Sequence, residues 1–167
     1  MRYEVIAHAA AVTAQEQAAV AHVPGRSFAK VLIVKERDGY VMAILPAAAE
    51  LDLDRLKGLI GHGEVRLATV EEIHGVVPDC AAGAIPPFGA LYGIRSFIDH
   101  TLLATPQVTM PAGHPGAAIR MRSAELRRIG GARPGDFAVP VALVAAGGVA
   151  RPRGARGRTP SRPPGTR

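Results

Sequence analysis

The sequence of 167 residues contains few of the residues on which several classes of protein depend. Its single cysteine, Cys80, excludes an internal disulfide framework. Tryptophan is absent and aromatic residues make up 4%, so an aromatic platform for the bases of single-stranded RNA is not expected. The apolar stretch 137–150 is broken by Pro140 and is too short to span a bilayer, and Glu4 interrupts the apolar N-terminus. We therefore expect a cytoplasmic protein that does not cross a membrane.

Acidic residues are missing from the C-terminal segment 151–167, which carries six arginines. Of the 20 basic residues, 14 lie outside this segment, where they balance the 14 acidic residues. Proline, glycine and arginine bury little apolar surface, so we expect a folded domain over 1–140 and a disordered tail over 141–167. We interpret the tail first as a solvated extension, and contact with RNA phosphates is the alternative.

Motifs for phosphate, metal or nucleophilic chemistry are also missing. There is no Walker loop, no G-x-G-x-x-G after a predicted strand, and no H-E-x-x-H or C-x-x-C pairing, so neither a nucleotide loop nor a zinc site is predicted. Asp99 and His100 are interpreted as residues of a strand end and turn, because the chain lacks a G-x-S-x-G nucleophile elbow. Cys80 has no basic neighbour in sequence to activate it, which favours a passive role.

Apolar patterning and capping residues predict an α+β domain. Thr-x-x-Glu capping boxes at Thr13 and Thr69 predict helices that end near His22 and Gly75, and Asp38-Gly39 predicts a hairpin. We predict strands over 3–7, 28–35, 40–46, 64–68, 95–99, 107–110 and 117–121, a helix over 51–60, and a last helix capped by Ser123 and ending at Gly130-Gly131. Because strict βαβ alternation is absent, we predict a single domain with a mixed, mostly antiparallel sheet flanked by short helices.

Two features remain that this outline does not explain. The segment 83–93, GAIPPFGALYG, combines two prolines and three glycines without a charge, which predicts a stiff apolar loop. Lys30 lies at the start of an apolar strand, where lysines seldom lie buried without a partner or a task. The simpler interpretation of Lys30 is that its amine extends along the strand to solvent.

The motifs AKVLIVK, DG, LP, VRLATVEE, GAIPPFGALYG, AIRM and LRRI follow one another along the chain. In this order they resemble the YbaK/aminoacyl-tRNA synthetase-associated (prolyl-tRNA synthetase editing-like) domain family, over roughly 1–140. That family includes free-standing trans-editing proteins and the editing insertion of bacterial prolyl-tRNA synthetases. The resemblance implies a trans-editing deacylase that hydrolyses tRNA charged with the wrong small amino acid.

The resemblance also assigns roles to particular residues. It implies that Lys30 positions the acyl or phosphate end of the substrate, and that Gly83–Pro87 matches the G-x-x-x-P loop lining the amino-acid pocket. Glycine permits close approach, and the amide of Gly83 could bind a developing oxyanion. The implied catalytic residues are Lys30, Gly83 and His114, and the implied substrate-binding residues are Ala84, Ile85, Pro86, Pro87, Phe88, Gly89 and Gly113.

The implied reaction uses no metal, no cofactor and no protein nucleophile. A sugar hydroxyl of the terminal adenosine assists a bound water, and the protein supplies orientation and electrostatics. The implied partner is aminoacyl-tRNA at its acceptor end, with an aminoacyl-tRNA synthetase as a second candidate. The alternative function is a non-catalytic module that binds an aminoacyl-adenosine end or a nucleotide on the same fold.

One departure concerns the histidine. Many members carry glycine, one residue and histidine before the strand that corresponds to AIRM. Here the segment reads Ala112-Gly113-His114-Pro115-Gly116, so His114 lies one position early and Pro115 occupies the expected site. Either the loop shifts and His114 serves, or that role is lost; an exposed loop histidine is the plain alternative.

Overall fold

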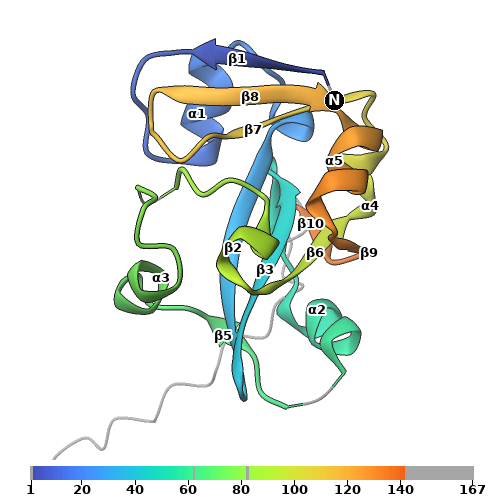
Figure 1. Cartoon of the computed structure of the whole chain (residues 1–167). Coiled ribbons are helices and arrows are strands. Elements are labelled where there is room, and N and C mark those ends of the chain that lie inside the picture. Colours follow the sequence, from blue (N-terminus) through green and yellow to red (C-terminus); the bar gives the residue numbers. More distant parts are fainter. Residues whose placement is uncertain (1, 62, 82, 142–167) are drawn as a thin grey trace, which may run out of the picture.

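A five-stranded sheet in the order β5-β2-β3-β6-β9 forms the centre of the structure (Figure 1). The computed structural model describes residues 2–61, 63–81 and 83–141. The strands of this sheet are β2 (Ala29–Glu36), β3 (Gly39–Pro46), β5 (Arg66–Leu67), β6 (Arg95–Asp99) and β9 (Arg133–Gly135). Antiparallel pairing joins β2 to β3 and β5, whereas β3 with β6 and β6 with β9 are parallel. The sheet is therefore mixed, as the sequence predicts.

A second sheet packs across the first one (Figure 1). It contains β1 (Tyr3–Ala7), β7 (Gln107–Pro111) and β8 (Ala117–Arg122), all antiparallel, in the order β1-β8-β7. A bridge between Phe28 and Thr109 connects β7 to the start of β2. The short strands β4 (Ala49–Leu51) and β10 (Ala138–Pro140) pair with each other. The connection between β7 and β8 is the segment 112–116, which carries the displaced histidine.

Short helices surround these sheets. They are α1 (Ala14–Val20), α2 (Leu53–Ile60), α3 (Val70–Val76), α4 (His100–Leu103) and α5 (Ser123–Gly130), with 3₁₀ turns η1 (Gly25–Ser27) and η2 (Gly89–Tyr92). Both predicted capping boxes are present: Thr13 with Glu16 begins α1, and Thr69 with Glu72 begins α3. The predicted mixed, mostly antiparallel arrangement with flanking short helices is thus confirmed at the level of elements.

Two details of the predicted helices were wrong. Ser123 does not cap α5, because β8 continues to Arg122 and the helix begins at once; the Ser123 hydroxyl donates to the Pro106 carbonyl at 3.4 Å instead. His100 is not a turn residue, because Asp99 caps a short helix that begins at His100. The interpretation of Asp99 as a strand-end residue is confirmed.

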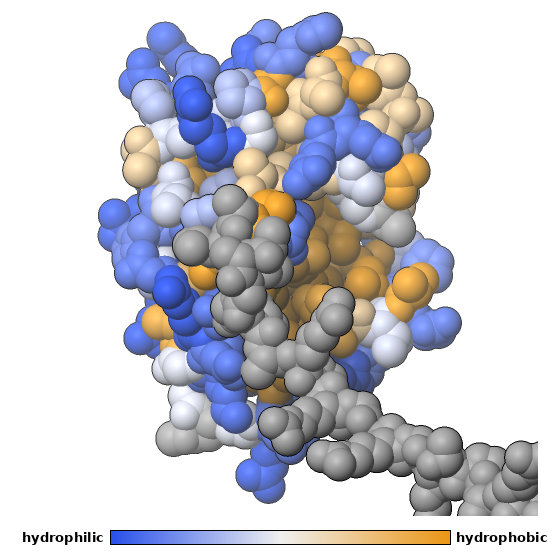
Figure 2. Space-filling view, turned by 180° about the vertical axis from the view of Figure 1, so that it is seen from behind, coloured by the Kyte–Doolittle hydropathy of each residue, from blue (hydrophilic) through white to orange (hydrophobic). Residues whose placement is uncertain are grey.

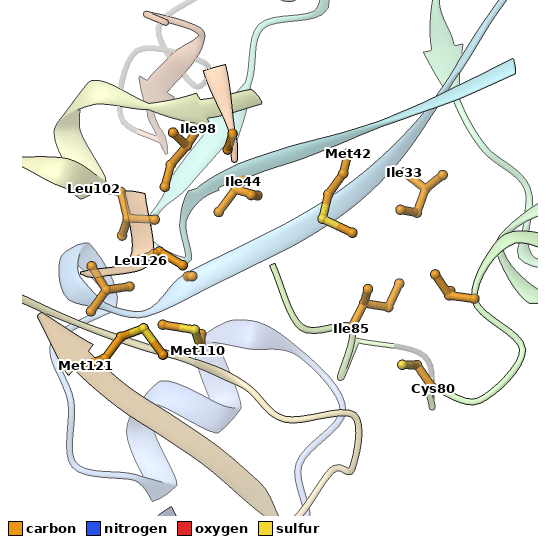
Figure 3. Close-up of a cluster of buried hydrophobic side chains, with 14 residues drawn as sticks. Ile33, Met42, Ile44, Cys80, Ile85, Ile98, Leu102, Met110, Met121 and Leu126 are labelled. Atoms are coloured by element: carbon orange, nitrogen blue, oxygen red, sulfur yellow. The ribbon is translucent and has the colours of Figure 1, made fainter. Parts of the chain in front are cut away.

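The larger buried cluster lies between the two sheets and includes the apolar loop (Figure 3). Met42 and Ile98 of the central sheet pack in it with Met110 and Met121 of the second sheet. Ile85, from the loop after α3, belongs to the same cluster. A smaller cluster, formed by residues that include Val41, Leu45, Leu56 and Phe97, packs α2 against the opposite face of the central sheet. The loop is therefore anchored in the core that joins the sheets.

No helix within the described ranges is long and apolar enough to cross a membrane. The tail predicted over 141–167 lies outside the described residues except for Val141, so its disorder and the boundary at 140 stay predictions.

Candidate functional site

The loop that follows α3 runs to the turn between β7 and β8 and then returns to η2 (Figure 1). At Gly83 the backbone has a φ of +75°, in the left-handed region that favours glycine. A Cβ atom at this position would overlap the carbonyl oxygen of Val12, just before α1. Gly83 itself is exposed, and its amide has no hydrogen-bond acceptor among the described residues. Both the backbone angle and the neighbouring carbonyl thus require glycine here.

Backbone hydrogen bonds fasten this loop to the β7–β8 turn. The amide of Gly113 donates to the carbonyl of Ala84 at 2.8 Å, and the amide of Ala81 donates to the carbonyl of Gly113 at 3.4 Å. Gly113 also has a positive φ, of +87°. The structure therefore brings together three of the residues that the sequence assigns to the site: Gly83, Ala84 and Gly113.

A buried glutamine fastens the same loop to α1. Gln17 has no exposed surface, and its Nε2 donates to the carbonyl of Gly83 at 2.9 Å. The same Nε2 lies 3.5 Å from the carbonyl of Val12. Sequence reasoning did not single out Gln17. The signal was available, because Gln17 interrupts the apolar face that Ala14, Ala18 and Ala21 form at helical spacing.

His114 lies in the β7–β8 turn, next to Gly113. Its side chain is exposed, and its Nδ1 accepts a hydrogen bond from the amide of Gly116 at 3.0 Å. The imidazole is thus folded onto its own turn, and one ring nitrogen is occupied by the backbone.

Lys30 projects from β2 toward the neighbouring strand β4. Its amine donates to the carbonyl of Ala49 at 2.5 Å and lies 3.8 Å from a carboxylate oxygen of Glu50. The side chain is 17% exposed, against 48% for Glu50. The amine therefore lies between a carbonyl and a carboxylate rather than extending freely into water.

Lys30 and the loop are connected through α1. Among the described residues, no hydrogen bond or ion pair joins the Lys30 side chain to the segment 83–89 or to His114. Gln15 of α1 donates to the carbonyl of Ala47 at 3.2 Å, two residues before the carbonyl that holds Lys30. Gln17, two residues further along the same short helix, holds Gly83. Helix α1 thus fixes the loop on one side and the Lys30 neighbourhood on the other.

The remaining loop residues differ in what their side chains contact. Ala84 and Ile85 are buried, so any contact of theirs with a substrate passes through the backbone. Pro87 is buried and Pro86 is half-buried. Gly89 has no room for a Cβ, because Ser96 Oγ and the carbonyl of Ile94 occupy that space. Phe88 lines an apolar groove of about 380 Å³, with the further lining residues Tyr3, Ala90, Leu91, Ile119, Met121 and Ile129.

A larger cavity of about 1110 Å³ lies next to Glu50, the carboxylate near the Lys30 amine. Glu50 lines it together with Asp52, Lys57 and other charged residues of both signs, and with apolar side chains that include Leu51 and Val65. No residue of the segment 83–89 lines this cavity. The rear face of the molecule shows an apolar hollow bordered by hydrophilic side chains (Figure 2).

Cys80 and Tyr92 join the two ends of the long loop. Their sulfur and hydroxyl oxygen lie 3.1 Å apart. Burial, together with the hydrogen bond to Cys80, raises the pKa of Tyr92 to about 12. The hydroxyl thus stays protonated at neutral pH and can keep this contact.

A family model for the aminoacyl-tRNA editing domain matches residues 8–129, a range that contains Lys30, the loop 83–89 and His114. The chain belongs to this family. The resemblance found in the sequence is thereby confirmed, and the editing domain occupies most of the chain.

Solved structures share the fold of the editing domain. The hypothetical protein APE2540 is 25% identical, with a TM-score of 0.76 over 83% of this chain and 93% of that chain. A candidate trans-editing enzyme for prolyl tRNA synthetase is 29% identical, with a TM-score of 0.72 over 81% of this chain and 85% of that chain.

Curated relatives match over shorter stretches. The proline–tRNA ligase of Thermosipho africanus is 39% identical over 61 residues, which are 36% of this chain and 11% of the ligase. The proline–tRNA ligase of Fervidobacterium nodosum is 36% identical over 91 residues, which are 53% of this chain and 15% of the ligase. This chain thus corresponds to a small part of these ligases.

Other polar residues of the editing domain have structural partners. Asp99 is buried: its Oδ2 accepts from the amides of Phe137 and Ala138 at 2.8 and 2.7 Å, and its Oδ1 accepts from Thr101. It therefore fastens Phe137 and the first residue of β10 to the end of β6. Within the described ranges, no group of three or more His, Cys, Asp and Glu side chains could hold a metal ion.

Proposed function

We propose that the protein is a trans-acting deacylase that removes a small, wrongly attached amino acid from tRNA. The observation that carries this proposal is the Gly83 loop, which is fastened to Gly113 within the range of the editing-domain match and leaves the Gly83 amide without an acceptor among the described residues. A backbone donor without a protein acceptor, on a fixed loop, is what a developing oxyanion needs.

In the proposed reaction, water attacks the ester carbonyl that links the amino acid to the terminal ribose. The carbonyl oxygen gains negative charge, which the Gly83 amide stabilises. The ester C–O bond then breaks, the ribose oxygen takes a proton, and a free amino acid leaves. The neighbouring ribose hydroxyl orients the water, so the protein contributes placement rather than a nucleophile. This route needs no metal or cofactor.

Lys30 is proposed to position the substrate's acyl or phosphate end. An ammonium group has three donors, and the Ala49 carbonyl accepts from one of them. The remaining donors lie toward Glu50 and can face an anionic or carbonyl oxygen of the substrate. In this arrangement the Ala49 carbonyl fixes the direction of the Lys30 side chain, and the Glu50 carboxylate lies 3.8 Å from its amine.

The proposed preference for a small amino acid rests on the loop's uncharged wall. Gly83 and Gly113 add no side chain, and Ala84 turns its methyl group into the core. Which small amino acid is preferred depends on differences of one methylene, which discriminate only modestly.

The proposal is tested by a deacylation time course with tRNAs carrying alanine, serine, cysteine or proline. We expect the wild-type protein to release one of them, and Lys30→Ala to lower kcat/KM by roughly a hundredfold or more. Lys57→Ala, which removes an exposed lysine of α2, is the matched control and should act as wild type. Equal activity of Lys30→Ala and wild type, with both proteins folded, would contradict the role of Lys30.

The second candidate is a non-catalytic module that binds the aminoacyl-adenosine end. The orientation of His114 favours it, because that imidazole is occupied by its own turn and Pro115 stands at the expected histidine position. Stoichiometric binding of aminoacyl-tRNA without turnover would favour this function over the first.

A further inference from the structure

Gln17 is a polar side chain without exposed surface at the junction between α1 and the Gly83 loop. Buried polar groups are costly unless they are hydrogen-bonded, so such a residue needs a reason to be there. Its neighbours at helical spacing are Ala14, Ala18 and Ala21, which contribute to an apolar cluster. An apolar side chain of similar length would satisfy packing alone.

The orientation of the Gln17 amide is determined by its partners. Both nearby partners, Gly83 at 2.9 Å and Val12 at 3.5 Å, present carbonyl oxygens, which only the NH₂ group can approach favourably. Its Oε1 is then left buried and without a donor among the described residues. The hydrogen bond from Gln17 to the loop therefore leaves the Oε1 atom of Gln17 without a hydrogen bond, which is energetically unfavourable.

The two carbonyls that Gln17 approaches are that of Gly83 itself and that of Val12, which lies against Gly83. The oxygen of Val12 occupies the space where a Cβ of residue 83 would lie, and the oxygen of Gly83 receives the Gln17 hydrogen bond. One amide therefore holds both the chain entering α1 and the carbonyl of Gly83, the residue whose own N–H is the candidate oxyanion donor. Displacing that donor by about 1 Å can cost roughly a hundredfold in rate.

We propose that Gln17 is a positioning residue of the deacylation reaction, an inference that rests on the proposed function. It does not touch the substrate. It holds the carbonyl of Gly83 so that the neighbouring amide of the same residue faces the ester oxygen during the attack.

The test compares Gln17→Met, which keeps the length of the side chain and removes its hydrogen bonds, with Gln17→Glu, which places oxygens against both carbonyls. We expect Gln17→Met to lower kcat by roughly tenfold or more, with KM within about twofold of wild type. Gln17→Glu should lower kcat further. Gln107→Met, at an exposed glutamine of β7, is the matched control and should leave both constants unchanged.

Two readouts separate positioning from a general loss of structure. Assays run well below the thermal midpoint of each variant keep all proteins folded. In NMR spectra of the free protein, Gln17→Met should shift the amide resonances of Gly83 and Gly113 and leave those of α5 in place. Unmoved Gly83 resonances, or a kcat equal to that of wild type, would overturn the assignment of Gln17. Absence of any wild-type deacylation, with Gly83 shifted in the variant, would instead overturn the proposed function and with it the catalytic role of Gln17.

Discussion

Gly83 illustrates how a single position can be restricted twice, by its own backbone angle and by a neighbouring atom. Its positive φ disfavours any residue with a Cβ, and the Val12 carbonyl fills the space that the Cβ would need. Gly131 shares the positive φ, at +62°, but a Cβ there would meet no atom within 4 Å. An alanine at Gly131 would therefore suffer only the unfavourable backbone angle, whereas an alanine at Gly83 would also overlap the Val12 carbonyl.

We expect Gly83→Ala to lower the free energy of unfolding by about 1–3 kcal/mol and deacylation by roughly a hundredfold, because the loop must move away from Val12. Gly131→Ala should cost about 1 kcal/mol and leave deacylation unchanged. Urea unfolding and deacylation kinetics of both variants measure this difference. If Gly83→Ala matched Gly131→Ala in both measurements, the overlap with Val12 would have no effect on the loop.

At the scale of elements, β5 and α3 are joined by one carboxylate at the base of the long loop. Glu72 accepts both guanidinium donors of Arg66, at 2.7 and 2.8 Å, and also the amide of Thr69 at 2.9 Å. These bonds, with Arg66 first, lower the pKa of Glu72 to about 2. Because the folded pKa lies below the unfolded one, Glu72 stabilises the folded protein above about pH 4.5, and this contribution is lost as the pH falls toward 2.

The comparison of wild type with Glu72→Gln tests this contribution. We expect wild type to have the higher free energy of unfolding at pH 7, and the difference to shrink steadily between about pH 4.5 and pH 2. Glu71→Gln removes a charge from the same turn of α3 and serves as the control for net charge. Urea unfolding at several pH values measures the difference. A gap between wild type and Glu72→Gln that stays constant over this range would be incompatible with the Arg66–Glu72 bonds.

Elements that depend on neighbouring residues were predictable, and those that depend on distant partners were not. The capping boxes at Thr13 and Thr69 depend on local sequence, and both are present. The hairpin signalled by Asp38-Gly39 is also present, but its two turn residues are Arg37 and Asp38, and Gly39 already pairs with Glu36. The strands β4, β9 and β10 were missed, because three residues carry no periodicity and form a strand only by pairing with remote segments. Helix α4 was missed because its four residues also read as a turn.

For the candidate site, the sequence predicts that the loop 83–89 takes part, which stays a prediction, and it does not predict the contacts that hold this loop. The prolines and glycines of 83–89 mark the loop, and the family motifs give Lys30 and Gly113. The bonds from Gln17 to Gly83 and from Gly113 to Ala84 join residues far apart in the chain. Their partners depend on the packing of α1 against the two sheets, which no local pattern encodes.

At the scale of the whole molecule, the balanced charges of 1–150 and the six arginines of 151–167 are separated along the chain. If the alternative interpretation of the tail as an RNA contact holds, deletion of 151–167 weakens binding to tRNA at about 50 mM salt much more than at about 200 mM salt, because phosphate contacts release counterions. Deacylation at saturating substrate should be unchanged. Equilibrium binding of full-length and shortened protein at both salt concentrations measures the effect, and identical affinities at low salt would show that the tail does not contact RNA.

The burial of Ile85 has a consequence for how the site responds to stress. Ile85 shares a cluster with Met42, Ile98 and Met110, so the loop's anchor and the packing between the sheets belong to one cooperative unit (Figure 3). A loop held in this way does not open as a hinged lid while the core stays intact. We therefore expect heat or denaturant to disrupt the geometry at Gly83 at the same point as the packing between the sheets, and a substrate to meet a surface that is already shaped before it arrives.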